Sequence, residues 1–164
     1  MSLNIRLATK KDMPEVLNLI KELATFEKEP FVVEVTVGEL QEDGFGNSPE
    51  FICFVAEMNE KVQGMALAYK RYSTWKGKVL HLEDLIVKRE SRGRQIGTKL
   101  LDEIVKYAFK IGVKRISWEV LEWNQPAIEL YNKKGAKIKE DWRVVHLDEQ
   151  GIKNYISKIQ NESI

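Results

Sequence analysis

A buried strand, a loop and a long helix follow one another in the middle of the chain. Residues 79–87 are mostly apolar, which predicts a strand, and residues 96–111 carry apolar side chains at helical spacing. Gly112 stands where a glycine commonly ends a helix, and a second strand is expected over residues 115–121. A strand, a crossover helix and a further strand form a βαβ unit, which predicts a mixed α/β fold.

The segments on either side of this unit add strands and helices without a low-complexity linker or an internal repeat. Thr9 with Asp12, and Thr36 with Glu39, have the spacing of a capping box, which predicts a helix start at each site. Strands are expected over residues 3–7, 51–57, 62–72 and 142–147. Helices are expected over residues 13–24, 125–134 and 151–159, and a further short helix should end at the glycines within residues 43–46.

The composition limits the classes of protein to which the chain can belong. Its 164 residues, 43% of them hydrophobic, fit one domain spanning residues 1–164. A formal charge of +1 gives no field that would favour nucleic acid or an anionic membrane as a partner. One cysteine and two histidines do not make the usual four-ligand zinc site, so no metal is expected. The lack of a long apolar run and of a signal peptide predicts a cytoplasmic protein.

The loop before the long helix is a candidate anion site. It reads Glu90-Ser91-Arg92-Gly93-Arg94-Gln95-Ile96-Gly97-Thr98, and Lys88 and Arg89 add positive charge before it. Free backbone N–H groups and the positive end of the helix suit a pyrophosphate, although such a loop is more often only a solvated turn. The glycine spacing matches neither the dinucleotide motif nor the nucleoside-triphosphate motif, so NAD and nucleoside triphosphates are poor candidates.

Glu83 and Asp84 are adjacent carboxylates within an otherwise apolar strand. Strict alternation predicts that Asp84 shares a face with Leu82 and that Glu83 shares a face with His81, so that one carboxylate must point inward. A buried carboxylate is unfavourable unless it is paired, hydrogen-bonded or protonated. The alternatives are therefore a functional carboxylate and a purely structural salt bridge or strand cap.

A third segment, residues 121–136, combines a helix start with a tyrosine. Asn124 can cap this helix, and Pro126 suits its first turn. Tyr131 alone would more often be a half-buried core residue than a catalyst. The interpretation of Tyr131 as catalytic therefore depends on the other two segments. Cys53 lies in an apolar strand and is expected to be a buried, inert thiol.

These three segments, in this order and spacing, resemble the GNAT family of N-acetyltransferases. The acetyl-CoA loop of that family, Gln/Arg-x-x-Gly-x-Gly/Ala, is matched from Arg92 to Gly97, except that Gln95 stands where the middle glycine is usual. A positive φ at Gln95 would weaken CoA binding, whereas a negative φ would make the change mild. Within the family, the chain is similar to the diamine (spermidine/spermine) and thialysine acetyltransferases at residues 19–24, 42–46, 72–78, 82–84, 123–125 and 135–136.

The resemblance implies a central, mostly antiparallel, twisted sheet of about seven strands, flanked by helices and splayed between the fourth and fifth strands. It also implies a homodimer and the direct transfer of an acetyl group from acetyl-CoA to a primary amine of a small diamine or lysine-like substrate. Ser73-Thr74 is the thialysine-type sequence, where the polyamine enzymes have Asp-Pro, which disfavours long polyamines. The alternatives are acetylation of a protein lysine or N-terminus, and a non-catalytic acyl-CoA-binding module.

The resemblance finally implies roles for individual residues. Glu83 would accept the ammonium proton, directly or through water, and Tyr131 would protonate the departing thiolate. The residues expected to bind acetyl-CoA are Leu85, Ile86, Val87, Arg92, Gly93, Arg94, Gln95, Ile96, Gly97, Thr98, Asn124, Ala127 and Lys134. The residues expected to bind the amine are Phe26, Glu27, Ser73, Trp75, Glu83, Asp84 and Trp142, with a core role as the alternative for either tryptophan.

Overall fold

The computed structural model describes residues 3–162, and the chain divides between Leu121 and Glu122 into an N-terminal and a C-terminal compact unit. The C-terminal unit consists of α4 (Gln125–Lys133), α5 (Glu149–Glu162) and the segment that joins them. The expectation of one domain over residues 1–164 stays a prediction. No helix in the described part of the chain has the length and apolar character needed to cross a membrane.

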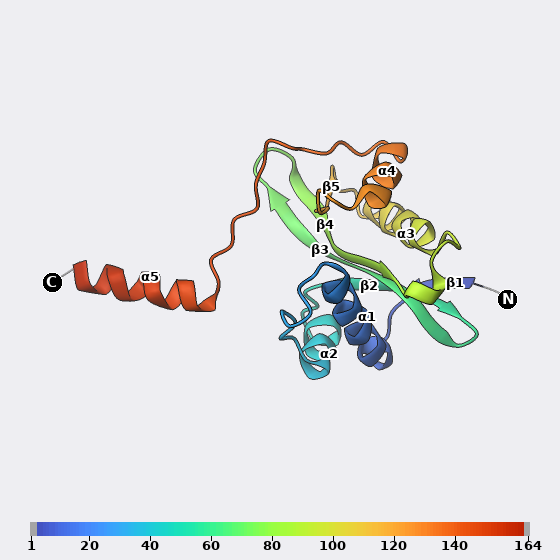
Figure 1. Cartoon of the computed structure of the whole chain (residues 1–164), viewed down its shortest axis with the longest axis horizontal. Coiled ribbons are helices and arrows are strands. Elements are labelled where there is room, and N and C mark those ends of the chain that lie inside the picture. The colour runs from blue at the N-terminus through green and yellow to red at the C-terminus, as the bar shows by residue number, and fades with distance from the viewer. Residues whose placement is uncertain (1–2, 163–164) are drawn as a thin grey trace. The chain divides into compact units, whose positions relative to one another are not determined.

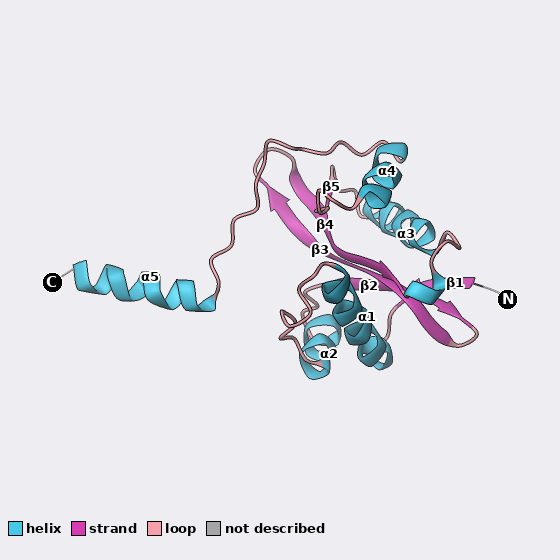
Figure 2. Cartoon of the chain, in the orientation of Figure 1, coloured by secondary structure: helices cyan, strands magenta, loops and turns pink. Residues whose placement is uncertain are grey.

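A sheet with the strand order β1-β2-β3-β4-β5 forms the centre of the N-terminal unit (Figures 1 and 2). The first four strands pair antiparallel, and β5 runs parallel to β4, which confirms the mixed α/β class and the mostly antiparallel sheet. The strands are β1 (Leu3–Leu7), β2 (Ile52–Met58), β3 (Lys61–Ser73), β4 (Gly77–Val87) and β5 (Ile116–Ser117).

The sheet has five strands within residues 3–162, fewer than the expected seven or so. The strand expected over residues 115–121 contains only Ile116–Ser117, and the strand expected over residues 142–147 is absent from the described chain. Trp142 and Val145 are largely exposed there. Alternating apolar residues become a strand only where a neighbouring backbone pairs with them, and residues 142–147 have no ladder partner within the described residues.

Helices cover both faces of the sheet. In Figure 1, α1 (Met13–Phe26) and α2 (Val37–Phe45) lie on one face and α3 (Ile96–Lys110) lies on the other. The rings of Phe54 on β2 and Tyr107 on α3 meet edge to face, with their centroids 6.2 Å apart. The face towards α1 and α2 buries a core made of Met13, Val16, Leu17, Leu19, Leu40, Cys53, Val55, Val62, Met65, Leu67 and Ile86.

The capping boxes predicted from the sequence lie at the starts of α1 and α2. Thr9 N–H donates to the Asp12 carboxylate at 2.7 Å just before α1, and Glu39 N–H donates to Thr36 Oγ1 at 3.2 Å at the start of α2. Both capping boxes predicted from the sequence are therefore present.

The parallel contact between β4 and β5 is short. Leu80–His81 pair with Ile116–Ser117, and β4 then continues to Val87 without a neighbour on that side among residues 3–162. The two strands therefore part after His81, which agrees with the splay expected between the fourth and fifth strands.

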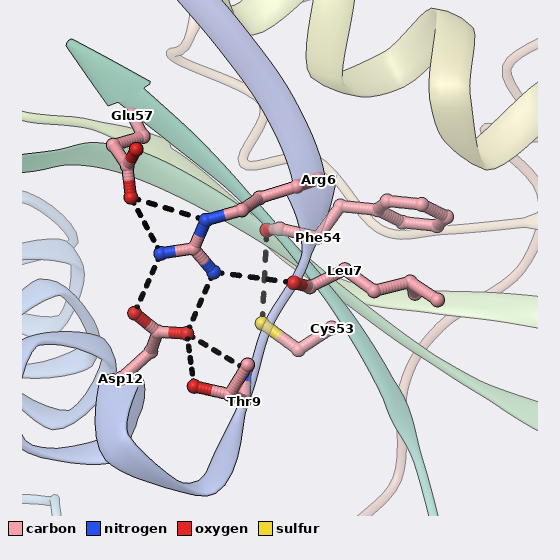
Figure 3. Close-up of polar contacts among 7 residues, drawn as sticks. All are labelled: Arg6, Leu7, Thr9, Asp12, Cys53, Phe54 and Glu57. Carbon is pink, nitrogen blue, oxygen red and sulfur yellow. Dashed lines mark hydrogen bonds and ion pairs between the residues drawn. The ribbon is translucent and has the colours of Figure 1, made fainter. Parts of the chain in front are cut away.

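A charged cluster ties β1 to the start of α1 and to β2 (Figure 3). Arg6 Nη1 and Nη2 donate to the two Asp12 carboxylate oxygens at 2.8 and 2.9 Å, and Nη2 also donates to Glu57 Oε2 at 2.6 Å. Because the Asp12 carboxylate accepts these bonds, its pKa falls from 3.8 to about 2. A pKa depressed by folding stabilises the folded state above the unfolded pKa, and this contribution is lost as pH falls from about 4 towards 2.

Replacing Asp12 by asparagine should therefore lower the free energy of unfolding by about 2 kcal/mol near pH 7. The difference from the wild type should shrink near pH 3, where Asp12 of the unfolded chain is already largely protonated. Urea unfolding at the two pH values measures both effects. Asp43→Asn, which changes an exposed aspartate, is the matched control, and equal unfolding midpoints for Asp12→Asn and wild type near pH 7 would contradict the prediction.

Candidate active site

A β-bulge in β4 determines where the two adjacent carboxylates point. Leu82 pairs with Ala68, but Asp84 pairs with Leu67, so Glu83 is the extra residue of the bulge. Leu67 and Ala68 are consecutive on β3 and face opposite sides of the sheet, so Asp84 faces away from Leu82. The expectation that Asp84 shares the face of Leu82 is therefore wrong, because the bulge interrupts the alternation of the strand.

Asp84 is the carboxylate that points inward, on the face covered by α1. It lies opposite Leu67, which belongs to the core between the sheet and α1. Burial, followed by the charges of Glu83 and Glu27, raises the pKa of Asp84 from 3.8 to about 6. Burial also raises the pKa of Glu27, at the C-terminal end of α1. The mutual repulsion of these carboxylates makes the site favourable for a cation.

Glu83 is the accessible carboxylate of the pair. Its side chain is 53% exposed, and its Oε2 lies 3.5 Å from Nε2 of His81. His81 lies opposite Tyr69, which shares the α1 face with Leu67, so Glu83 and Asp84 border the same region of the sheet. The bulge thus brings together the two carboxylates that strict alternation would separate.

Two backbone amides of β4 point to the open edge created by the splay. Lys88 N–H donates to Gln63 O of β3 at 2.8 Å. Because N–H groups alternate in direction along a strand, the amide of Ile86 also points towards β3. The amides of Leu85 and Val87 point the other way, where no described strand pairs with β4. Of the three β4 residues expected to bind acetyl-CoA, Leu85, Ile86 and Val87, two therefore offer a backbone N–H group at this edge.

Two of the four basic residues that precede α3 have side chains anchored within the N-terminal unit. Arg92 Nε donates a hydrogen bond of 3.0 Å to the backbone carbonyl oxygen of Val87, the last residue of β4. Its Nη2 lies 3.7 Å from a carboxylate oxygen of Glu22. The guanidinium also lies over the Phe26 ring, 5.2 Å from the centroid. Lys88 Nζ lies 3.1 Å from a carboxylate oxygen of Glu15. Arg92 and Lys88 thus hold the loop against α1 and β4, and their charges are already partly neutralised.

The start of α3 offers the arrangement that an anion requires. Gly93 and Gln95 adopt positive φ angles of 78° and 59°, and the Gln95 side chain does not cap the helix. The first three amides of α3, residues 96–98, therefore lack a capping partner from Gln95. Arg94 is exposed next to them. Gln95 thus has the positive φ that was expected to weaken CoA binding, a conformation that costs a residue other than glycine about 1–2 kcal/mol.

Ser73 and Trp75 lie away from the carboxylates along the sheet. Ser73 Oγ accepts hydrogen bonds from the amides of Trp75 and Lys76 at 3.3 Å each, so it closes the turn between β3 and β4. Trp75 at this turn is 80% exposed. Ser73 lies about 20 Å along β3 from Leu67, the residue opposite Asp84, at the usual rise per residue. Within one chain, the structure does not bring Ser73 and Trp75 to the Glu83–Asp84 region.

The remaining predicted residues belong to the C-terminal unit. Asn124 Oδ1 accepts a hydrogen bond from Ala127 N–H at 3.4 Å and so caps α4, as predicted. Tyr131 on the same helix is buried, which raises the pKa of its phenol above 10. Lys134 is the C-cap residue of α4. Trp142 is 66% exposed in the segment between α4 and α5.

One polar contact of this region was not predicted from the sequence. His81 Nδ1 lies 3.0 Å from Ser117 Oγ across the short parallel pairing of β4 and β5. A histidine two residues before a carboxylate in an apolar strand was the available signal. Within residues 3–162, no group of three or more His, Cys, Asp or Glu side chains is arranged to hold a metal ion. Cys53 is buried, which raises the pKa of its thiol to about 12, as expected of an inert residue.

Comparisons with known proteins agree in the family that they indicate. Residues 15–136 match the acetyltransferase (GNAT) family. The chain is 35% identical to a Bos taurus thialysine N-epsilon-acetyltransferase over 94% of this chain and 97% of the relative. It is 35% identical to a human spermidine/spermine N(1)-acetyltransferase-like protein 1, over 89% of this chain and 22% of that longer protein. An integron cassette protein from V. cholerae has the same fold, with a TM-score of 0.77 at 19% identity over 95% of this chain and 98% of the other.

Proposed function

The chain belongs to the acetyltransferase (GNAT) family and is an N-acetyltransferase, and we propose that it transfers the acetyl group of acetyl-CoA directly to a primary amine of a small diamine or lysine-like substrate. One observation carries the proposal: Glu83 and Asp84 meet on one face of the sheet, at the strand whose amide edge is open. The similarity to a thialysine N-epsilon-acetyltransferase over most of the chain supports a lysine-like amine.

Different carboxylates bind the amine and deprotonate it. An alkylammonium, with a pKa near ~10.4, must lose a proton before its nitrogen can attack a thioester. Glu83 is exposed and accepts that proton, directly or through water. Asp84 is more enclosed, and it holds the positive charge of the substrate together with Glu27 at the end of α1. A small amine therefore meets separate groups for binding and for deprotonation.

Backbone N–H groups bind the acetyl donor. The amides of Leu85 and Val87 face the open edge and can donate to pantetheine and to the oxyanion that forms on the thioester carbonyl. The amides of residues 96–98 and the side chain of Arg94 suit the pyrophosphate of acetyl-CoA. Tyr131 supplies a proton to the departing thiolate, and no covalent enzyme intermediate is required. A homodimer and a cytoplasmic location stay predictions.

Replacing Gly97 by valine should weaken CoA binding roughly ten- to hundredfold, the effect of losing charge-assisted hydrogen bonds. A Cβ at Gly97 would lie 3.7 Å from the nearest side-chain atom, of Val87, so the fold accommodates the first added carbon without a clash. Gly38→Val is the matched control, because Gly38 is also the second residue of an exposed helix start. Calorimetry with CoA measures both variants. Unchanged affinity in Gly97→Val would place the phosphate site elsewhere.

Release of CoA with a panel of amines tests the proposed function. The panel contains thialysine, lysine, ornithine, short diamines, spermidine and a lysine-containing peptide, with acetyl-CoA hydrolysis without amine as the baseline. Turnover of small diamines or lysine-like amines above that baseline is expected. Turnover of the peptide alone would favour a protein acetyltransferase, and CoA binding without turnover of any amine would favour a binding module. Either result would contradict the proposal.

A further inference from the structure

His81 is a buried polar residue that has no role in the proposed function as described above. It is 6% exposed and lies between three side chains of the N-terminal unit. Nδ1 lies 3.0 Å from Ser117 Oγ on β5, and Nε2 lies 3.5 Å from Glu83 Oε2 on the bulge. The ring also contacts that of Tyr69 on β3, with centroids 5.2 Å apart. The imidazole is thus held from two strands and faces the accessible carboxylate.

These contacts select one form of the imidazole. Burial, which outweighs the charge of Glu83, lowers the pKa of His81, so the ring is neutral at neutral pH. A neutral ring carries one N–H, and its other nitrogen presents a lone pair. A lone pair on Nε2 would face the negative charge of Glu83, whereas Ser117 can donate its hydroxyl hydrogen to Nδ1. The proton therefore resides on Nε2 and points to Glu83.

We propose that His81, held by Ser117, is a positioning residue that orients the Glu83 carboxylate for removal of the ammonium proton. This inference rests on the proposed function of Glu83. At 3.5 Å the contact of Nε2–H with Oε2 of Glu83 is a charge–dipole interaction that restrains the carboxylate, while the Glu83 side chain stays 53% exposed. Glu83 stays next to His81, as alternation along the strand already places it, and the bulge brings Asp84 to the same face.

The charged groups around the ring come from β3, from β4 itself and from the segment that follows β5. Glu83 and Glu119 act to raise the pKa of His81, and Arg71 acts to lower it. Tyr69 is the remaining titratable neighbour, and burial raises the pKa of its phenol. No change of protonation at His81 is needed near neutral pH, since the proposed role depends on the Nε2–H donor of the neutral ring.

A double-mutant cycle tests whether His81 acts through Glu83. His81→Phe keeps an aromatic ring beside Tyr69 but removes the donor, and kcat for a good amine should fall roughly tenfold with little change in KM for acetyl-CoA. His81→Gln, which can place a side-chain N–H near the position of Nε2, should recover part of this loss. In the Glu83→Gln background, His81→Phe should have little further effect. If His81→Phe still lowered kcat roughly tenfold in the Glu83→Gln background, the proposal would be overturned.

The ring nitrogens provide a readout that does not depend on turnover. The chain has only two histidines, so 15N spectra of the imidazoles can be assigned with the exposed His146→Phe as the control variant. Wild type should show the Nε2–H tautomer at His81, and Ser117→Ala should mix the two tautomers. The Nδ1–H tautomer in wild type would overturn the proposal. The expected tautomer in a protein that acetylates no amine would instead refute the proposed function while confirming the local geometry.

Discussion

Glu83→Gln should lower kcat by roughly 10²–10⁴-fold, the usual contribution of a general base, while the affinity for acetyl-CoA changes little. The carboxylate lies on the bulge of β4 with half of its side chain exposed, and it has His81 beside it. Glutamine keeps the size of the side chain but cannot accept the ammonium proton. Activity of the variant should therefore shift towards high pH, where more of the amine is already deprotonated.

Asp84→Asn is the matched comparison, because it removes the adjacent carboxylate. We expect it to raise KM for the amine more than it lowers kcat, since Asp84 holds charge in the proposed site. The pKa of Asp84 is about 6, so wild type should lose amine affinity as pH falls below that value. Asp84→Asn should lack this acid-side loss. Wild-type kcat in Glu83→Gln, together with a large kcat loss in Asp84→Asn, would transfer the role of base to Asp84.

Tyr131→Phe should lower kcat by a similar factor, roughly 10²–10⁴-fold, and should do so across the whole pH range. Burial raises the pKa of Tyr131 above its usual value, which keeps the phenol protonated near neutral pH. A thiolate of pKa near ~8.5 is a weaker base than the phenolate, so the proton must move as the C–S bond breaks. Loss of the donor therefore affects the chemical step and not a titration.

Tyr155→Phe is the control for Tyr131→Phe, because Tyr155 is an exposed tyrosine of the same unit. Both variants are compared with one good amine under conditions in which chemistry limits the rate. A Tyr131→Phe enzyme with wild-type kcat would remove Tyr131 from the mechanism and leave water as the proton donor.

Local patterns predicted most elements of the N-terminal unit. Capping boxes and helical spacing are local properties, and α1, α2 and α3 lie where they were expected. Residues 142–147 have the composition of a strand but form none in the described chain, because pairing depends on a partner that no local pattern contains. β5 is short for the same reason, since it pairs with β4 at only two positions.

The candidate site depends on features that the sequence does not encode locally. Residues 79–87 read as a regular strand, and only the pairing with β3 reveals that Glu83 is an extra residue. The contact of His81 with Ser117 requires the parallel register of β4 and β5. Arg92 and Arg94 were both expected to bind acetyl-CoA, and both roles stay predictions. The contacts of the Arg92 guanidinium with β4 and α1 become visible only in the folded chain.

A competition between two amines tests whether the enzyme prefers a small lysine-like substrate. Thialysine and a lysine-containing peptide are supplied at equal concentration with limiting acetyl-CoA, and the acetylated products are quantified by mass spectrometry. We expect nearly all of the acetyl group on the side-chain amine of thialysine, and we expect Glu83→Gln to slow formation of this product without redirecting the acetyl group to the peptide. Acetyl transfer mainly to the peptide, or loss of acetyl-CoA only to hydrolysis, would contradict this expectation.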